Sequence, residues 1–138
     1  MPHRFATMLT CIDGRIQAPL SEWAKSHLEV DYVDTVTEPG PDSAIGSLGE
    51  EGLAALVAKV RVSQRAHGSG VLVVAGHSDC AGNPVADEEH HRQLRQAATQ
   101  LAALLPDLRI IALHAGQCGE DCWLPVVVTE ITPSAVTA

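Results

Sequence analysis

The chain has 138 residues, the length of one domain and enough to bury a core without disulfide bonds. Nine lysines and arginines stand against 17 aspartates and glutamates, and this net charge of −8 leaves no basic patch for a nucleic acid. No apolar run approaches the ~20 residues of a membrane span, and the first residues lack the layout of a signal peptide, so we expect a cytoplasmic protein without membrane contact.

Periodicity and turn residues divide the chain into alternating strands and helices. Short β-branched or apolar runs predict strands, and apolar residues at helical spacing predict the helices between them. Ser47 and Glu50 have the spacing of a capping box at the start of the longest helix, and Gly68 is expected to end it. In chain order we expect strand 4–11, helix 20–28 after Pro19, strand 31–37, loop 38–47, helix 47–67, strand 71–76, helix 87–105, strand 109–115, turn 116–122 and strand 124–131.

This alternation indicates an α/β fold with three layers. A mainly parallel sheet would lie between helices, with right-handed crossovers and a strand order of about 2-1-3-4. Strand 5 follows strand 4 closely enough to pair with it as an antiparallel strand at the edge. Hydrophobic residues make up 46% of the chain and aromatic residues 3%, which suits aliphatic strands buried on both faces. We expect a single domain over 1–138, with a core of about 5–131 and a loose tail over 132–138.

Two short polar motifs follow the first and third strands, at the point where each strand ends. Cys11 closes the first strand, and Asp13 and Arg15 follow it at alternating positions. His77 follows the third strand, and Cys80 comes three residues later. Strands 1 and 3 are neighbours in the predicted order and flank the switch point where doubly wound sheets bind ligands. We therefore expect the two motifs to converge.

Two thiolates and one imidazole form a suitable ligand set for zinc. Three protein ligands leave a fourth position open, which is typical of catalytic zinc, and zinc lowers the pKa of a bound water to roughly 7. If the segment stays extended, Asp13 lies on the same side as Cys11 and can reach the metal or its water. Arg15 can hold Asp13 away from the metal through a bidentate ion pair. For either motif alone, a small buried cysteine is the alternative.

Cys11-Ile-Asp13-Gly-Arg15 followed by His77-Ser-Asp-Cys80 resembles the motif pair of the β-class carbonic anhydrases, in a short, carbonic anhydrase-like branch of that family. The resemblance implies that Cys11, His77 and Cys80 bind one Zn²⁺ per chain. It also implies that Asp13 and Arg15 form a dyad that keeps the fourth position open and orients a zinc-bound hydroxide. The implied reaction is the reversible hydration of carbon dioxide to bicarbonate. Members of the family are homodimers or multiples of dimers.

Two stretches differ from the usual pattern of that family, which the chain resembles over roughly residues 5–131. DTVTEPGPDSAIG stands where a VRNAGN-like stretch usually follows the second strand. Ala81 and Gly82 stand where two glycines are usual, so Gly82 retains one backbone position near the site.

Glu38 lies in the loop after the second strand. It is either a second proton acceptor facing the cleft or a turn carboxylate before Pro39, and both interpretations stay open.

Other polar residues have simpler interpretations. Cys118 and Cys122 lie in the predicted turn, where we favour two free thiols; a disulfide or a second metal site that includes His114 are the alternatives. His90 and His91 are expected on a solvated helix face, rather than as proton shuttles. Asp79 is expected to cap a helix or accept a hydrogen bond, without a part in the chemistry.

Two rival functions would use the same metal. One is hydrolysis of carbon disulfide or carbonyl sulfide by the same hydroxide, reached through an apolar tunnel. The other is a non-catalytic zinc-binding or sensor protein, although a purely structural zinc site needs no dyad of Asp13 and Arg15. A redox function of Cys118 and Cys122 gains little support from their spacing.

Overall fold

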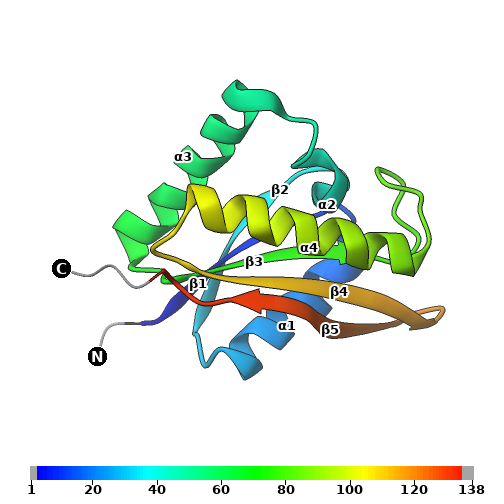
Figure 1. Cartoon of the computed structure of the whole chain (residues 1–138). Helices are drawn as coiled ribbons and strands as arrows, with labels where there is room; N and C mark the ends of the chain where they lie inside the picture. Colours follow the sequence, from blue (N-terminus) through cyan, green and yellow to red (C-terminus); the bar gives the residue numbers. More distant parts are fainter. Residues whose placement is uncertain (1–2, 135–138) are drawn as a thin grey trace.

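The five strands of the protein form one sheet, seen in Figure 1 in the order β2-β1-β3-β4-β5. The structure is a computed structural model that describes residues 3–134. The strands from β2 to β4 are parallel, and β5 pairs with β4 as an antiparallel edge strand. The predicted fold class and strand order are therefore confirmed. The elements are β1 (Phe5–Thr10), the 3-10 helix η1 (Gly14–Ile16), α1 (Gln17–His27), β2 (Tyr32–Thr37), α2 (Pro41–Ala44), α3 (Gly49–His67), β3 (Val71–His77), α4 (Asp87–Leu104), β4 (Arg109–Gly119) and β5 (Cys122–Ile131).

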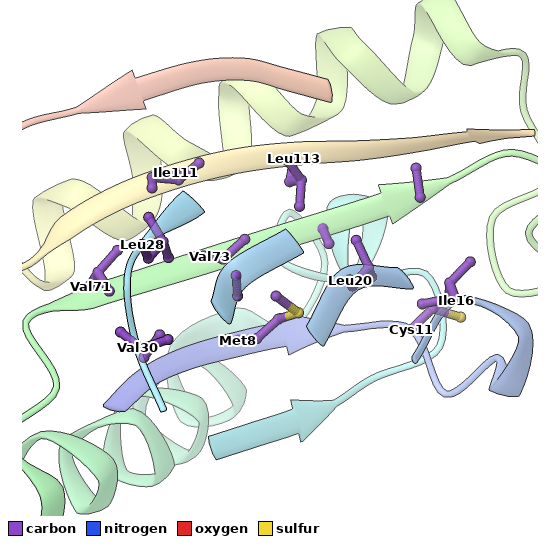
Figure 2. Close-up of a cluster of buried hydrophobic side chains, with 14 of the residues drawn as sticks. Met8, Cys11, Ile16, Leu20, Leu28, Val30, Val71, Val73, Ile111 and Leu113 are labelled. Carbon is purple, nitrogen blue, oxygen red and sulfur yellow. The ribbon is translucent and has the colours of Figure 1, made fainter. Parts of the chain in front are cut away.

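Different helices cover the two faces of the sheet. Along the fully buried strand β3, Val73 and Ala75 belong to a core cluster that includes side chains of α1. Figure 2 shows this cluster, which also contains side chains of β1 and β4. The alternate residues Leu72 and Val74 belong to a second cluster, with side chains of α3 and α4. Because successive side chains of a strand face opposite sides, His77 is in phase with Val73 and Ala75. His77 therefore lies on the face that α1 covers.

The parallel register brings the carboxyl ends of β1 and β3 to the same edge of the sheet. Leu9 near the end of β1 pairs with Val74 of β3. Cys11 follows β1 by one residue, and it lies beside Ile16 in the buried cluster of Figure 2. His77 is the last residue of β3. The fold thus places the two sequence motifs at one end of neighbouring strands.

Helix α1 begins earlier than the sequence predicts, and the loop after β2 is more ordered than predicted. The helix starts at Gln17, so Pro19 lies within its first turn and does not precede it. Proline is tolerated there because the first turn of a helix needs no backbone N–H donor. The predicted loop 38–47 contains the short helix α2, with Pro41 at its first position.

The predicted capping box at the start of α3 is wrong. The residue that precedes the helix is Leu48, and no side chain caps the helix there. The Ser47 hydroxyl instead donates a hydrogen bond to the carbonyl oxygen of Ala44 at 3.2 Å. Ser47 thus belongs to the turn that follows α2, and it does not cap α3. The predicted end of α3 is confirmed, since Gly68 adopts the left-handed conformation with φ 70°.

The hairpin of β4 and β5 is longer than predicted, and only Glu120 and Asp121 remain as its turn. Because the strands continue to this tip, Gly119 pairs with Cys122 in the antiparallel ladder. Cys118 and Cys122 then have Cα atoms 5.0 Å apart and form a disulfide. The prediction of two free thiols is wrong, and so is the alternative of a second metal site.

The described chain ends shortly after β5. Residues 132–134 have no regular secondary structure, and the rest of the predicted loose tail, 135–138, lies outside the described residues. Among the described residues, none of the helices combines the length and the apolar character that a membrane crossing needs.

Candidate metal centre

Cys11, His77 and Cys80 come together beyond the carboxyl ends of β1 and β3. The three side chains are buried, and their ligand atoms all lie within 4.8 Å of one another. The two sulfur atoms are 3.8 Å apart. Two sulfurs bound at ~2.3 Å to a tetrahedral zinc ion would be separated by about 3.8 Å. Within residues 3–134, no other group of three or more such side chains converges in this way.

The His77 imidazole is oriented by a hydrogen bond on its far side. Its Nδ1 lies 2.7 Å from the carbonyl oxygen of Ser78. A carbonyl oxygen only accepts hydrogen bonds, so Nδ1 carries the proton and Nε2 keeps its lone pair. This Nε2 is buried and has no hydrogen-bond partner in the described part of the chain. A histidine that binds a metal usually has this arrangement, so the residues present fit a zinc ion.

The Cys80 thiol is held by its neighbours. Burial, and then the nearby Cys11 thiol, raise the pKa of Cys80 to about 11, although backbone N–H groups of Gly82 and Asn83 donate toward its sulfur and oppose the rise. Without a metal the thiol therefore keeps its proton at neutral pH, and zinc binding must release it.

A Cβ at Gly82 would lie 2.9 Å from Pro39, so only glycine fits there. The assignment of Gly82 to the site stays a prediction.

Asp13 and Arg15 form an ion pair beside the three ligands. Nε and one Nη of Arg15 donate to the two carboxylate oxygens of Asp13 at 3.1 and 2.8 Å. These hydrogen bonds lower the pKa of Asp13 to about 2, and the same pair raises the pKa of Arg15 above its usual range. Asp13 Oδ2 lies 3.9 Å from Nε2 of His77. An ionised carboxylate therefore stands next to the ligand cluster.

This pairing arises from a turn, so it does not depend on the segment staying extended. β1 ends at Thr10, and Asp13 caps η1 by accepting the backbone N–H of Arg15 at 2.9 Å. The side-chain amide of Gln17 donates to the carbonyl oxygens of Cys11 and Asp13, each at 2.8 Å. The condition of an extended segment up to Arg15 is therefore not met, because the capped turn begins right after Asp13.

Two residues without predicted chemistry contact Arg15. Asp79 accepts hydrogen bonds from Arg15 through its carboxylate at 3.2 Å and through its carbonyl oxygen at 3.1 Å. It does so in the left-handed region, with φ 54°, which is uncommon for a residue other than glycine. Trp123 of β5 lies with its ring 5.0 Å from the guanidinium carbon of Arg15. Asp79 could be suspected from its place between His77 and Cys80, whereas Trp123 carries no sequence signal.

Glu38 lies just after β2, at the same edge of the sheet. Its side chain is half-buried, and its backbone N–H donates to the carbonyl oxygen of Thr10 at 3.0 Å. This bond ties the segment after β2 to the end of β1. The following Gly40 adopts a φ of 54°, and a Cβ there would lie 2.7 Å from Cβ of Asn83. The two loops are therefore in close contact, and the role of Glu38 as a proton acceptor stays a prediction.

A second polar cluster lies on the opposite face of the sheet. The Asp42 carboxylate lies 2.5 Å from Nδ1 of His90, and both side chains are fully buried. The Asn83 side-chain amide donates to Asp42 at 2.9 Å. A Cβ at Gly76 would lie 2.6 Å from Asp42 Oδ2, so the glycine before His77 makes room for this carboxylate. The prediction of a solvated face is wrong for His90, because α2 covers it.

His114 of β4 belongs to the same cluster. Its Nε2 lies 3.4 Å from the carboxylate of Asp87, and its ring centroid lies 5.6 Å from that of His90 and 4.6 Å from that of the half-buried His91. Burial lowers the pKa of His114 to about 4. This imidazole is therefore neutral at physiological pH.

Comparisons with known proteins match both the sequence and the fold. Residues 1–128 match the model of a family described as "Putative carbonic anhydrase". A solved carbonic anhydrase from Glaciozyma antarctica is 14% identical, with a TM-score of 0.54 over 93% of this chain and 83% of that one. The β-carbonic anhydrase CafA of the fungal pathogen Aspergillus fumigatus is 15% identical, with a TM-score of 0.51 over 94% and 78% of the two chains.

These two likenesses, at such low identity, show the fold. No curated protein matches the sequence. The family model, however, covers nearly the whole chain. The chain therefore belongs to the carbonic anhydrase family that this model describes.

Proposed function

We propose that the protein catalyses the zinc-dependent, reversible hydration of carbon dioxide to bicarbonate. One observation carries the proposal: an ionised Asp13 carboxylate lies 3.9 Å from Nε2 of His77, beside two thiols that complete a three-ligand group. A structural zinc site has four protein ligands, so it does not need an additional carboxylate beside it that is not a ligand. Membership in a carbonic anhydrase family and the shared fold support the same function.

Each residue of the site has a distinct task in this reaction. Cys11, His77 and Cys80 would hold the zinc, which supplies a bound water with a pKa near ~7. Asp13, ionised at neutral pH, accepts a hydrogen bond from the reacting water and so orients its oxygen toward carbon dioxide. Arg15 binds both carboxylate oxygens and so would keep Asp13 from becoming a ligand of the zinc itself.

The surroundings of Arg15 favour carbon dioxide and bicarbonate over the sulfur analogues. The Arg15 side chain is 45% exposed, at a groove that leads to solvent. Carbon disulfide would need an apolar passage, whereas charged groups at this opening suit the release of an anion such as bicarbonate. The cavity has a volume of about 410 Å³ and is lined by Arg15, Asp79, Cys80, Ala81, Pro84 and Val85.

The test is the initial rate of carbon dioxide hydration, measured near pH 7 and again above pH 8 on protein of known zinc content. We expect rapid turnover per zinc, unchanged in the exposed control variant Glu51→Gln on α3. One zinc per chain without hydration at either pH would contradict the proposal and favour a binding or sensor role. Faster hydrolysis of carbonyl sulfide or carbon disulfide than hydration of carbon dioxide would assign the site to that reaction.

The proposal includes assembly as a homodimer, as expected from the family resemblance. The edge strand β5 exposes Leu124, Val126 and Val127 at 59, 48 and 45% of their surface. Exposed apolar side chains on an unpaired strand edge are typical of an interface. Light scattering after gel filtration should give twice the mass of one chain, and Val126→Lys should lower it. A monomeric wild-type protein would contradict the assembly. The cytoplasmic location stays a prediction.

A further inference from the structure

The hairpin of β4 and β5 ends in a covalent bond near the metal centre. Cys118 and Cys122 are exposed and joined by a disulfide across the two strands. The pairing of the strands is irregular between Gln117 and Gly119, just before the turn. A two-stranded hairpin is only marginally stable by itself. The disulfide therefore adds a covalent constraint at this exposed tip.

Trp123 follows the disulfide directly and reaches the metal centre. It is half-buried and packs against the core cluster on the α1 face of the sheet. Its ring lies 5.0 Å from the guanidinium carbon of Arg15, and its centroid lies 5.9 Å from that of the His77 ring in an edge-on arrangement. Trp123 thus connects the hairpin tip to the dyad and to a ligand.

Arg15 is held by hydrogen bonds and by an aromatic ring. Asp13 and Asp79 accept hydrogen bonds from its nitrogens, while its guanidinium carbon lies over the ring of Trp123. A guanidinium can donate hydrogen bonds and make a cation–π contact at the same time. Because the Arg15 side chain is 45% exposed, loss of Trp123 would expose more of the guanidinium to water.

We propose that Trp123 is a positioning residue that holds Arg15 against Asp13, and that the Cys118–Cys122 disulfide keeps Trp123 in place. The effect on turnover rests on the proposed function, whereas the contact with Arg15 does not. A dithiol reductant would act by supplying two electrons and two protons. The bond between the Cys118 and Cys122 sulfurs breaks, two thiols form, and the dithiol closes to its own disulfide. Trp123 then moves more freely, and Arg15 loses its cation–π contact with the ring.

The first experiment follows Trp123 by fluorescence in the full-length chain as purified. Trp23→Phe leaves it as the single tryptophan, since the chain has two. Dithiothreitol should raise the acrylamide quenching constant and shift the emission to the red. The double variant Cys118→Ser with Cys122→Ser should show the higher constant from the start and should not respond to dithiothreitol, which controls for zinc removal. Equal quenching in the oxidised and reduced forms would overturn the role of the disulfide.

The second experiment measures carbon dioxide hydration at known zinc content. Trp123→Leu should lower kcat about two- to fivefold, the range for loss of a partly exposed cation–π contact, with KM and zinc content unchanged. Trp123→Phe should restore most of the activity. The double serine variant should lower kcat by a similar factor, and adding Trp123→Leu to it should have no further effect. Full activity of Trp123→Leu would overturn the inference. A loss in the triple variant equal to the product of the two separate losses would also overturn it. If no preparation hydrates carbon dioxide, the proposed function fails, and the fluorescence experiment still decides whether the disulfide keeps Trp123 in place.

Discussion

The two faces of the sheet at the end of β3 carry polar clusters of different kinds. On the α1 face, His77 and two cysteines direct buried ligand atoms toward one point, and Nε2 of His77 has no hydrogen-bond partner in the described chain. On the α4 face, both oxygens of Asp42 are bonded within the chain, one to His90 and one to Asn83. Within residues 3–134, Nε2 of His90 and Nε2 of His114 also make no hydrogen bond, but they are not part of a convergent group.

The difference indicates that the cluster on the α1 face is a ligand-binding site and that the cluster on the α4 face supports it. Asn83 contacts both, because its side chain donates to Asp42 while its backbone N–H donates to the carbonyl oxygen of Cys80 at 3.2 Å. The second cluster therefore fixes the loop that carries a ligand of the first. Convergent donors without partners indicate a metal, whereas a carboxylate with all its bonds made indicates structural support.

The largest expected effect is the loss of a ligand on the α1 face. Cys80→Ser should abolish stable zinc binding and lower turnover at least about 100-fold, since even outer partners of metal ligands contribute 10- to 100-fold. Zinc per chain after dialysis, measured by mass spectrometry of the metal, checks the result. Full retention of zinc would remove Cys80 from the ligand set.

Removal of the buried carboxylate on the α4 face should mainly affect stability. Asp42→Ala leaves His90 and Asn83 without their buried partner, and such a loss lowers the free energy of unfolding by about 1–3 kcal/mol. Urea unfolding gives the change, and the exposed variant Asp121→Asn serves as the control. A change below about 1 kcal/mol would mean that the cluster does not support the fold.

The buried His114 should make the α4 face sensitive to acid. Its pKa is about 4 in the folded protein, against a usual value of ~6.5, so below pH 6.5 the unfolded chain takes up a proton that the folded chain refuses. The free energy of unfolding should therefore fall between pH 6.5 and about 4, by at most about 3 kcal/mol. Above pH 6.5 this contribution is constant.

The comparison of wild type with His114→Gln isolates the contribution of His114 to the loss of stability in acid. Urea unfolding at pH 7 and pH 5 should show a smaller loss of stability in the variant than in the wild type. Asp87, His90, His91 and Asp42 surround this imidazole and are the same in both proteins. An equal loss in the two proteins would place the acid sensitivity elsewhere.

The smallest of these effects concerns the restrained carboxylate beside the ligands. Asp13→Asn should keep zinc, because Asp13 is not among the three ligands, but should lower turnover about 10- to 100-fold by weakening the orientation of the reacting water. Stopped-flow hydration assays at equal zinc content test this expectation. Unchanged turnover would show that the dyad with Arg15 has no part in the reaction.

The sheet order and the convergence of the three candidate ligands could be predicted from the sequence. Alternating strands and helices restrict the order of a mainly parallel sheet, and the carboxyl ends of neighbouring parallel strands meet at one edge. Cys11, His77 and Cys80 stand directly at or after such ends, so their convergence follows from the topology.

The remaining contacts depend on segments that are distant in sequence. His90 looks solvated by its polar neighbours, but α2 places Asp42 over it. The disulfide of Cys118 and Cys122 depends on how far β4 and β5 continue, which a stretch containing several turn residues does not reveal. Trp123 reaches Arg15 only because the hairpin extends to the metal centre.

The absorption spectrum of the protein loaded with cobalt(II) in place of zinc tests the metal centre most directly. We expect one cobalt per chain and strong thiolate-to-metal charge transfer, weakened by Cys11→Ser and by Cys80→Ser, because thiolates are the ligands. The double variant Cys118→Ser with Cys122→Ser should leave the spectrum unchanged. A protein that binds no cobalt, or a spectrum that neither ligand substitution alters, would contradict the assignment of Cys11, His77 and Cys80.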